Sequence, residues 1–126
     1  MKTLLLVALG GALGVSCRYG VGVVAAHFGG TQFPWGTFLV NIAGSFALGV
    51  AVTLMTFTWS PLPELRAFVM VGVLGGFTTF SAFSLDVVLM IERDRLALAA
   101  IYMTGTVVIS IVGLFAGLRL TRMVLA

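Results

Sequence analysis

Charged residues are scarce in this sequence. Only 9% of its 126 residues are Asp, Glu, Lys or Arg, whereas 60% are hydrophobic, and a typical soluble domain is about one quarter charged. So short a soluble chain would have a large surface for its volume and could not cover it with four acids and seven bases. The composition therefore excludes an ordinary soluble domain, a disordered chain and a nucleic-acid-binding module, and it indicates an integral membrane protein.

Cysteine and histidine are scarcer still. Cys17 and His27 are the single residues of their kinds, so the chain can form no internal disulfide and offers no Cys/His cluster with metal-ligand spacing. It also lacks a set of acids, bases and nucleophiles that could converge on a substrate. We therefore expect a protein that is not an enzyme. The scattered bases favour anchoring at the surfaces of a lipid bilayer over a nucleic-acid partner.

Four apolar stretches account for nearly the whole chain. They cover about residues 3–26, 35–59, 64–91 and 96–122. At about 20 apolar residues for each crossing, they predict an all-α integral membrane protein with four transmembrane helices in a single domain, residues 1–126. Trp35 and Trp59 lie at the two ends of the second stretch, which predicts an indole ring at each membrane interface.

The sixteen glycines predict close contacts between these helices. Three pairs have the four-residue spacing that lets helices approach closely in lipid. The pairs are Gly10 and Gly14, Gly72 and Gly76, and Gly113 and Gly117.

Basic residues are divided almost evenly between the two sides that four spans imply. One side has Lys2, Arg66, Arg119 and Arg122, and the other has Arg93, Arg95 and the deeper Arg18. So weak a bias would allow insertion in both orientations. Because four helices are too few to enclose a pathway, we hypothesise an antiparallel homodimer that combines both orientations.

The most polar part of a span is residues 72–84, which combine adjacent glycines, paired threonines and two phenylalanines. Glycine and β-branched residues are poor helix formers, so one interpretation is a helix broken at mid-membrane, whose freed carbonyls would suit a small hard cation. The alternative is a close-packed glycine kink in which the hydroxyls bond to their own helix.

Other polar residues are spaced so that they share helix faces. Tyr102, Thr106 and Ser110 form a hydroxyl stripe, Asn41 and Ser45 are four apart, and Phe80 and Phe83 are three apart. Uncharged donors and the positive edges of aromatic rings could line a path for a small anion. The alternatives are ordinary core packing and hydrogen bonds between helices.

Arg18 and Asp86 are the charged residues that lie inside a span, about two turns from ends that face the same side. Each should therefore meet water or a partner. They either pair with one another or reach the interface separately.

These residues carry a resemblance to the Fluc family of fluoride channels, also called CrcB, over nearly the whole chain. The matching stretches are Gly10-Gly11-Ala12-Leu13-Gly14 with Arg18-Tyr19, Pro34-Trp35-Gly36-Thr37 with Asn41-Ile42-Ala43-Gly44-Ser45, and Gly75-Gly76-Phe77-Thr78-Thr79-Phe80-Ser81-Ala82-Phe83-Ser84. The last is highly specific, whereas the glycine-rich first stretch is not. The resemblance implies an antiparallel, dual-topology homodimer with two pores in the cytoplasmic (inner) membrane of a prokaryote. Its implied function is passive, fluoride-selective export that relieves fluoride toxicity.

The resemblance also implies roles for individual residues. Phe80 and Phe83 are similar to the aromatic pair whose ring edges face the ion, and Asn41 to the amide that contacts the ion or orients those rings. Ser81, Tyr102, Thr106 and Ser110 are similar to the polar track, and Arg18 to a vestibule arginine that attracts anions. The carbonyls of Gly75 and Thr78 are similar to the ligands of a structural sodium ion at the dimer interface. Asp86 departs from the family, in which Glu is frequent.

The alternative function is that of a small proton-coupled multidrug-type exporter. That class uses a carboxylate in its first span, and residues 3–26 contain no acid. A structural subunit without transport activity would explain the glycines but not the Thr/Ser/Phe cluster.

Overall fold

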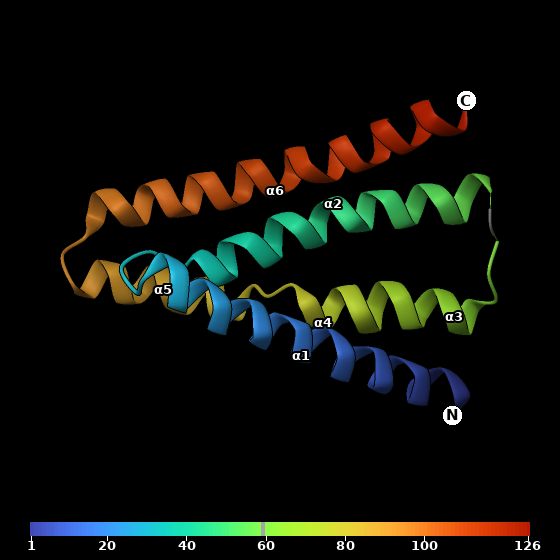
Figure 1. Cartoon of the computed structure of the whole chain (residues 1–126), viewed down its shortest axis with the longest axis horizontal. Coiled ribbons are helices and arrows are strands. Elements are labelled where there is room, and N and C mark those ends of the chain that lie inside the picture. The colour runs from blue at the N-terminus through green and yellow to red at the C-terminus, as the bar shows by residue number, and fades with distance from the viewer. Residues whose placement is uncertain (59) are drawn as a thin grey trace.

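The computed structural model describes residues 1–58 and 60–126, and this part of the chain is helical apart from short connections. The elements are α1 (Lys2–Gly29), α2 (Trp35–Phe57), α3 (Pro63–Ala67), the π-helix η1 (Phe68–Leu74), α4 (Gly75–Phe77), α5 (Ser81–Glu92) and α6 (Leu96–Leu125). They form an elongated bundle in which both termini and the start of α3 lie at one end (Figure 1). The expected end of the second span, at Trp59, lies outside the described residues.

Four of the segments are long and apolar enough to cross a membrane, which confirms this part of the prediction. They are Lys2–Gly29, Trp35–Phe57, Pro63–Glu92 and Leu96–Leu125. The first and last helices extend about one turn beyond the predicted ends at residues 26 and 122. Proline and glycine account for the connections, since Gly30 has a positive φ of 76° before α2 and Pro63 begins α3.

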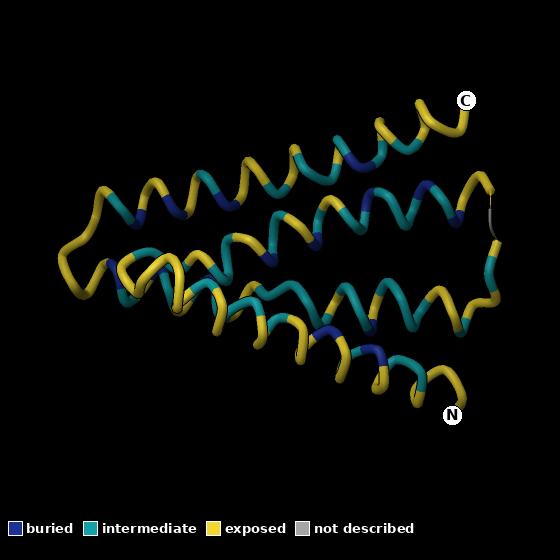
Figure 2. The backbone as a smooth tube through the Cα atoms, in the orientation of Figure 1, coloured by how far each residue is buried: buried dark blue, intermediate teal, exposed yellow. Residues whose placement is uncertain are grey.

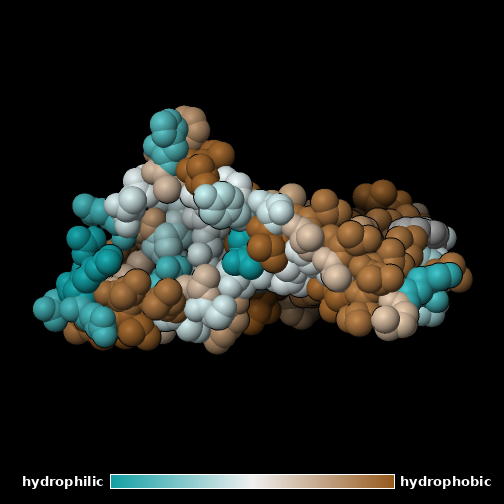
Figure 3. Space-filling model, turned by 90° about the horizontal axis from the view of Figure 1, so that it is seen from below, coloured by the Kyte–Doolittle hydropathy of each residue, from teal (hydrophilic) through white to brown (hydrophobic). Residues whose placement is uncertain are grey.

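Most large apolar side chains face outward. Buried positions are few and follow the inner faces of the helices, whereas exposed positions cover the outside (Figure 2). On the face that Figure 3 shows, hydrophobic residues cover much of the surface, and most of the hydrophilic residues lie toward the two ends. Exposing so much apolar surface to water would cost free energy, so this surface is suited to contact with lipid.

Glycine contacts join the helices in two pairs. A Cβ on Gly10 would lie 2.6 Å from the carbonyl oxygen of Phe68, and one on Gly72 would lie 2.9 Å from that of Val7, so the backbones of α1 and η1 are in contact. Gly49 of α2 and Gly117 of α6 meet in the same way. The predicted close approach is therefore confirmed for Gly10, Gly72 and Gly117, whereas Gly49 was not among the predicted pairs. Gly113 is less tightly packed, with its nearest neighbour 3.5 Å from an added Cβ.

The third span is not one uninterrupted α-helix. Its π-helix passes into the three residues of α4, and Thr78 then turns to an extended conformation with ψ 161°. Helix resumes at Ser81. We call the three residues between α4 and α5, residues 78–80, the break. Two adjacent glycines before it and two β-branched threonines within it explain why a continuous helix is disfavoured here.

Candidate functional site

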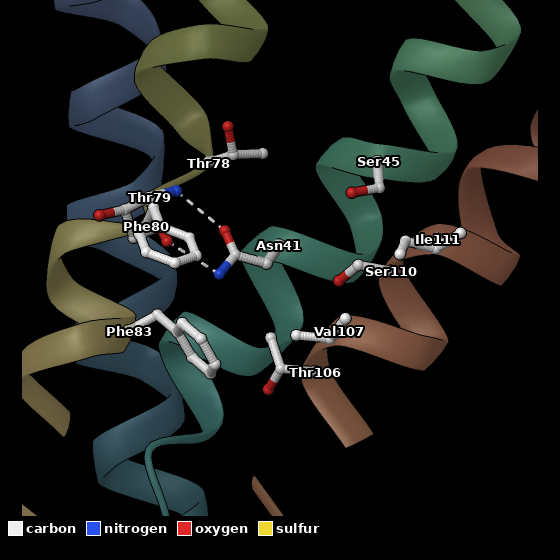
Figure 4. A pocket seen from close by; sticks show the side chains of 10 residues that line it. All are labelled: Asn41, Ser45, Thr78, Thr79, Phe80, Phe83, Thr106, Val107, Ser110 and Ile111. Carbon is white, nitrogen blue, oxygen red and sulfur yellow. Dashed lines mark hydrogen bonds between the residues drawn. The ribbon is translucent and has the colours of Figure 1, made fainter. Parts of the chain in front are cut away.

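The break is held from one side by Asn41 of α2. The backbone N–H of Thr79 donates to Asn41 Oδ1 at 2.8 Å, and Asn41 Nδ2 donates to the Thr79 carbonyl at 2.9 Å (Figure 4). A residue outside a helix leaves backbone groups that need partners when they are buried. The amide of Asn41 supplies both partners for Thr79.

Arg18 of α1 holds the break from another side. Its Nε donates to the carbonyl of Gly76 at 3.0 Å. In a continuous α-helix that carbonyl would accept from the N–H of Phe80, which lies beyond the point where the helix stops. The guanidinium therefore replaces a bond that the break removes.

Two carbonyls next to these bonds have no hydrogen-bond donor within the described chain, those of Gly75 and Thr78. The cause is local. The N–H of Thr79, which would reach Gly75 in a helix, is bonded to Asn41, and the N–H of Ala82, which would reach Thr78, donates to Thr79 Oγ1 at 3.2 Å. Both oxygens are thus available to a ligand from outside the chain.

The break opens onto a hollow of about 310 Å³ between α2, α5 and α6. Its lining residues are all uncharged and combine hydroxyls, one amide, two phenyl rings and two aliphatic side chains (Figure 4). The lining residues are Asn41, Ser45, Thr78, Thr79, Phe80, Phe83, Thr106, Val107, Ser110 and Ile111. We call this space the polar hollow.

The two phenylalanines lie together at the hollow but are buried to different extents. Their ring centroids are 5.6 Å apart with an interplanar angle of 61°, close to an edge-to-face arrangement. Phe83 is 6% exposed and packs in the core, whereas Phe80 is 76% exposed. The exposed ring of Phe80 leaves part of the hollow's wall uncovered in the single chain.

Two of the residues that line the hollow from α6 have buried hydroxyls without a partner among the described residues. Thr106 Oγ1 and Ser110 Oγ are both inaccessible to solvent, and neither has a hydrogen-bond partner among the described residues. Buried polar groups are usually paired, because an unpaired one costs about 1–3 kcal/mol. Such groups are donors ready for a ligand that enters the hollow.

Two predicted members of the polar track lie elsewhere. Tyr102 shares the helix face of Thr106, but it is fully buried and its hydroxyl donates to Asp86 Oδ2 at 2.9 Å. Ser81 is exposed at the first turn of α5 and does not line the hollow. Since Asp86 is bonded to Tyr102 and Arg18 to Gly76, the structure gives these two charged residues separate partners.

Arg18 borders a second hollow of about 400 Å³, on the α1 side of the break. Thr79 and Thr37 also line it. Thr79 therefore lies between this space and the polar hollow. The resemblance implies a vestibule role for Arg18 and gives no separate role to Thr79, whose importance follows only from its bonds to Asn41.

Two other lining residues, Val107 and Ile111, were not predicted, and a third, Ser45, was noted only for its spacing to Asn41. Val107 and Ile111 are ordinary apolar residues that carry no polar signal, although each directly follows a member of the hydroxyl stripe. Ser45 could be found from its spacing to Asn41.

No group of three or more His, Cys, Asp or Glu residues that could hold a metal occurs in residues 1–58 and 60–126. The oxygens available for a cation here are backbone carbonyls.

Comparison with known proteins bears on this arrangement. Residues 5–118 match the family model described as "CrcB-like protein, Camphor Resistance (CrcB)". The chain belongs to the CrcB family. It is 55% identical over 126 residues to a protein of Rhodospirillum centenum named "Fluoride-specific ion channel FluC", with 100% of both chains covered. A "Fluoride-specific ion channel FluC 2" of Nitrobacter hamburgensis is 52% identical over 94% of this chain and 95% of its own.

A third CrcB relative extends the same likeness. The "Fluoride-specific ion channel FluC" of Agrobacterium fabrum is 50% identical over 97% of this chain and 98% of its own. The alignments run through all four spans, so they include the break and the polar hollow.

Proposed function

We propose that the protein is a fluoride-selective channel whose ion path runs through the polar hollow. The observation that carries this proposal is the uncharged lining of the hollow, which combines two phenyl rings with Thr106 and Ser110, whose buried hydroxyls have no partner among the described residues. Membership of the CrcB family and relatives named as fluoride-specific channels support the same function.

The chemistry of the lining explains how such a path would work. A small anion must lose its water to enter a narrow space, so the wall has to supply hydrogen bonds in place of water. Thr106 and Ser110 offer neutral donors, and the positive edges of Phe80 and Phe83 offer further stabilisation. Neutral donors and ring edges hold a small anion more weakly than a charged side chain in direct contact would, so the ion can also be released.

The path is proposed to be passive. Proton coupling requires a carboxylate that can gain and lose a proton along the route. The hollow has no acid among its lining residues, and Asp86 is bonded to Tyr102 outside that lining. The proton-coupled exporter is therefore not favoured.

A structural sodium ion is proposed at the unpartnered carbonyls of Gly75 and Thr78. Backbone oxygens without formal charge suit a hard monovalent cation, and the two carbonyls fit that chemistry. One chain offers too few oxygens for a complete coordination shell. When bound, the ion would link two copies of the break.

The assembly proposed is an antiparallel homodimer with two pores, in the cytoplasmic membrane of a bacterium. The open side of the hollow beside Phe80 and the near-even division of basic residues between the two ends support it. In this assembly the break lies at mid-membrane, where non-helical backbone is tolerated only in protein or beside a cavity.

The proposed physiological role follows from the acid–base chemistry of fluoride. Neutral HF enters a cell from acidic surroundings, and it dissociates at the higher pH of the cytoplasm. The anion is then trapped inside. A passive channel would let it leave down its electrochemical gradient and so relieve toxicity.

The test is efflux from liposomes loaded with potassium fluoride, followed with a fluoride electrode. We expect fast release only after valinomycin removes the opposing voltage, and no chloride release from matched vesicles. Release driven by a proton gradient instead would contradict the passive mechanism, and equal chloride release would contradict selectivity.

A further inference from the structure

We propose that Arg18 is a positioning residue for the break: its Nε donor anchors the carbonyl of Gly76, independently of the positive charge that the side chain brings. The inference deepens the proposed function and rests on it, because the break forms the wall of the proposed path. The distinction matters because an arginine that only attracts anions needs its charge, whereas one that anchors a carbonyl needs a donor at one position.

The face of α1 that contacts the third span delivers Arg18 to this carbonyl. Gly10, Gly14 and Arg18 are spaced by four residues and share a face. The two glycines have no room for a Cβ, since one on Gly10 would lie 2.6 Å from the carbonyl oxygen of Phe68. Backbone contact over these two turns fixes the axial position of α1, and Arg18 follows one turn later at the level of the break.

On the third span, Gly76 is packed equally closely against α1. A Cβ on Gly76 would lie 2.9 Å from the carbonyl oxygen of Gly11 and 3.2 Å from its Cα. Gly76 is therefore packed against α1 at Gly11 and Val15, one to two turns before the residue that bonds its carbonyl. The steric contact and the hydrogen bond join the same two segments.

The bond has a physical reason at the end of a helix. Residues 63–77 are helical, and their last carbonyls lack the partners that a continuing helix would supply. Arg18 supplies the missing donor, with its Nε 3.0 Å from the carbonyl oxygen of Gly76.

An external anchor is needed because Gly75 and Gly76 are adjacent. Glycine has more backbone freedom than other residues, so peptide planes in this pair can rotate readily. The carbonyl of Gly75, which has no partner in the described chain, is the neighbour of the plane that Arg18 fixes. Holding Gly76 thereby restricts the direction in which Gly75 presents its oxygen.

Three substitutions of Arg18 separate its role as a donor to the Gly76 carbonyl from its role as a positive charge. In Arg18→Gln the amide nitrogen lies as many bonds from Cα as Nε does, so the donor is retained and the charge is lost. Arg18→Lys keeps the charge but places its nitrogen one bond further out. Arg18→Met removes both. Arg93→Gln, in the exposed turn before α6, is the control for loss of one positive charge.

The direct readout is amide hydrogen exchange of peptides that cover residues 75–84, with peptides from α6 as the internal reference. We expect Arg18→Met to speed exchange in this segment by about tenfold, because the hydrogen bond to a partly buried carbonyl is lost. Arg18→Gln should leave exchange near that of the wild type, and Arg93→Gln should not change it.

Fluoride efflux at low and high ionic strength supplies the second readout. Long-range attraction by a charge is screened by salt, whereas the anchor is not. Arg18→Gln should lose flux at low ionic strength and approach the wild type at high ionic strength, and Arg18→Met should stay impaired at both. Flux in Arg18→Lys should be salt-dependent like that of the wild type but lower.

The proposal is overturned if Arg18→Lys matches the wild type in exchange and flux while Arg18→Gln exchanges fast, because charge alone would then matter. Unchanged exchange in Arg18→Met would overturn it as well. If Arg18→Met does not fold, the Gln and Lys variants still decide. Absence of fluoride efflux in the wild type would contradict the proposed function, while the order of exchange rates would still test the anchor.

Discussion

Asn41 and Thr79 are joined by two hydrogen bonds of 2.8 and 2.9 Å, in which one side-chain amide pairs with both backbone groups of a residue 38 positions away. The pairing imitates one rung of a β-ladder between a helix and an extended segment. It leaves Asn41 with one N–H that these two bonds do not use, because an amide has two such donors. The same residue can therefore shape the break and present a donor to the polar hollow.

Removing the amide of Asn41 should affect both stability and flux. Asn41→Ala leaves the N–H and carbonyl of Thr79 without partners, at a cost of about 1–3 kcal/mol for each group that stays buried. We expect a lower unfolding temperature and a large loss of fluoride efflux. Ser45→Ala is the control for stability, since Ser45 lines the same hollow and its side chain makes no hydrogen bond among the described residues. Flux in Asn41→Ala equal to that of the wild type would contradict the role of the clamp.

The two phenylalanines should separate function from packing. Phe80→Ile and Phe83→Ile each remove a ring from the hollow and should each impair efflux while leaving the proposed dimer intact. Only Phe83 is buried, so only Phe83→Ile should also reduce stability, by about 1–3 kcal/mol. Phe115→Ile, on an exposed part of α6, is the matched control. If both variants conduct normally, the aromatic-edge mechanism is wrong.

Composition and spacing predicted the four spans because lipid imposes a simple rule, and the sequence meets it at each crossing. For residues 72–84 the local chemistry left open a broken helix and a close-packed glycine kink, and the structure has a break at residues 78–80. The bonds that organise it were not predictable, because they join residues far apart in the chain. Arg18 illustrates this: its depth suggested either Asp86 or the interface as its partner, and the glycine contacts of α1 bring it to Gly76 instead.

The hydroxyl stripe shows a second limit. A spacing of four places Tyr102 on the same face as Thr106 and Ser110, but a longer side chain reaches further. Its hydroxyl meets Asp86 on α5, outside the lining of the hollow. Periodicity gives the face that a residue occupies and not the atom that it will bond.

The unpartnered hydroxyls give a test in which stability and flux change in opposite directions. Thr106→Val keeps the size of the side chain and removes a buried group without a partner. Stability should stay the same or rise by about 1 kcal/mol, because no bond is lost and a desolvation cost disappears. Fluoride efflux should fall. Thr53→Val is the control, since its hydroxyl bonds the Gly49 carbonyl outside the hollow. Undiminished efflux in Thr106→Val would remove this hydroxyl from the path.

The bond between Tyr102 and Asp86 should be visible in a double-mutant cycle. Tyr102→Phe and Asp86→Asn each break or weaken the 2.9 Å contact. If the two side chains act as a pair, the double variant should be less destabilised than the sum of the single variants, by about 0.5–3 kcal/mol. Thermal unfolding in detergent measures this coupling. Additive effects would show that the contact contributes nothing to stability.

Glycine packing gives the last prediction, in which two neighbouring alanine substitutions should act in opposite directions. Gly14 lies against the backbone of Val73, so the Cβ of Gly14→Ala would force α1 away from η1 and displace Arg18 from Gly76. A Cβ on Gly11 would point away from Gly76 and meet nothing within 4 Å, so the expected effect of Gly11→Ala is a gain in helix propensity of about 1 kcal/mol. We expect Gly14→Ala to lower the unfolding temperature and to reduce fluoride efflux, and Gly11→Ala to leave efflux unchanged and raise the unfolding temperature slightly. Thermal unfolding and liposome efflux on the two variants check both parts, and similar behaviour of the pair would contradict the contact between α1 and η1 on which the position of Arg18 depends.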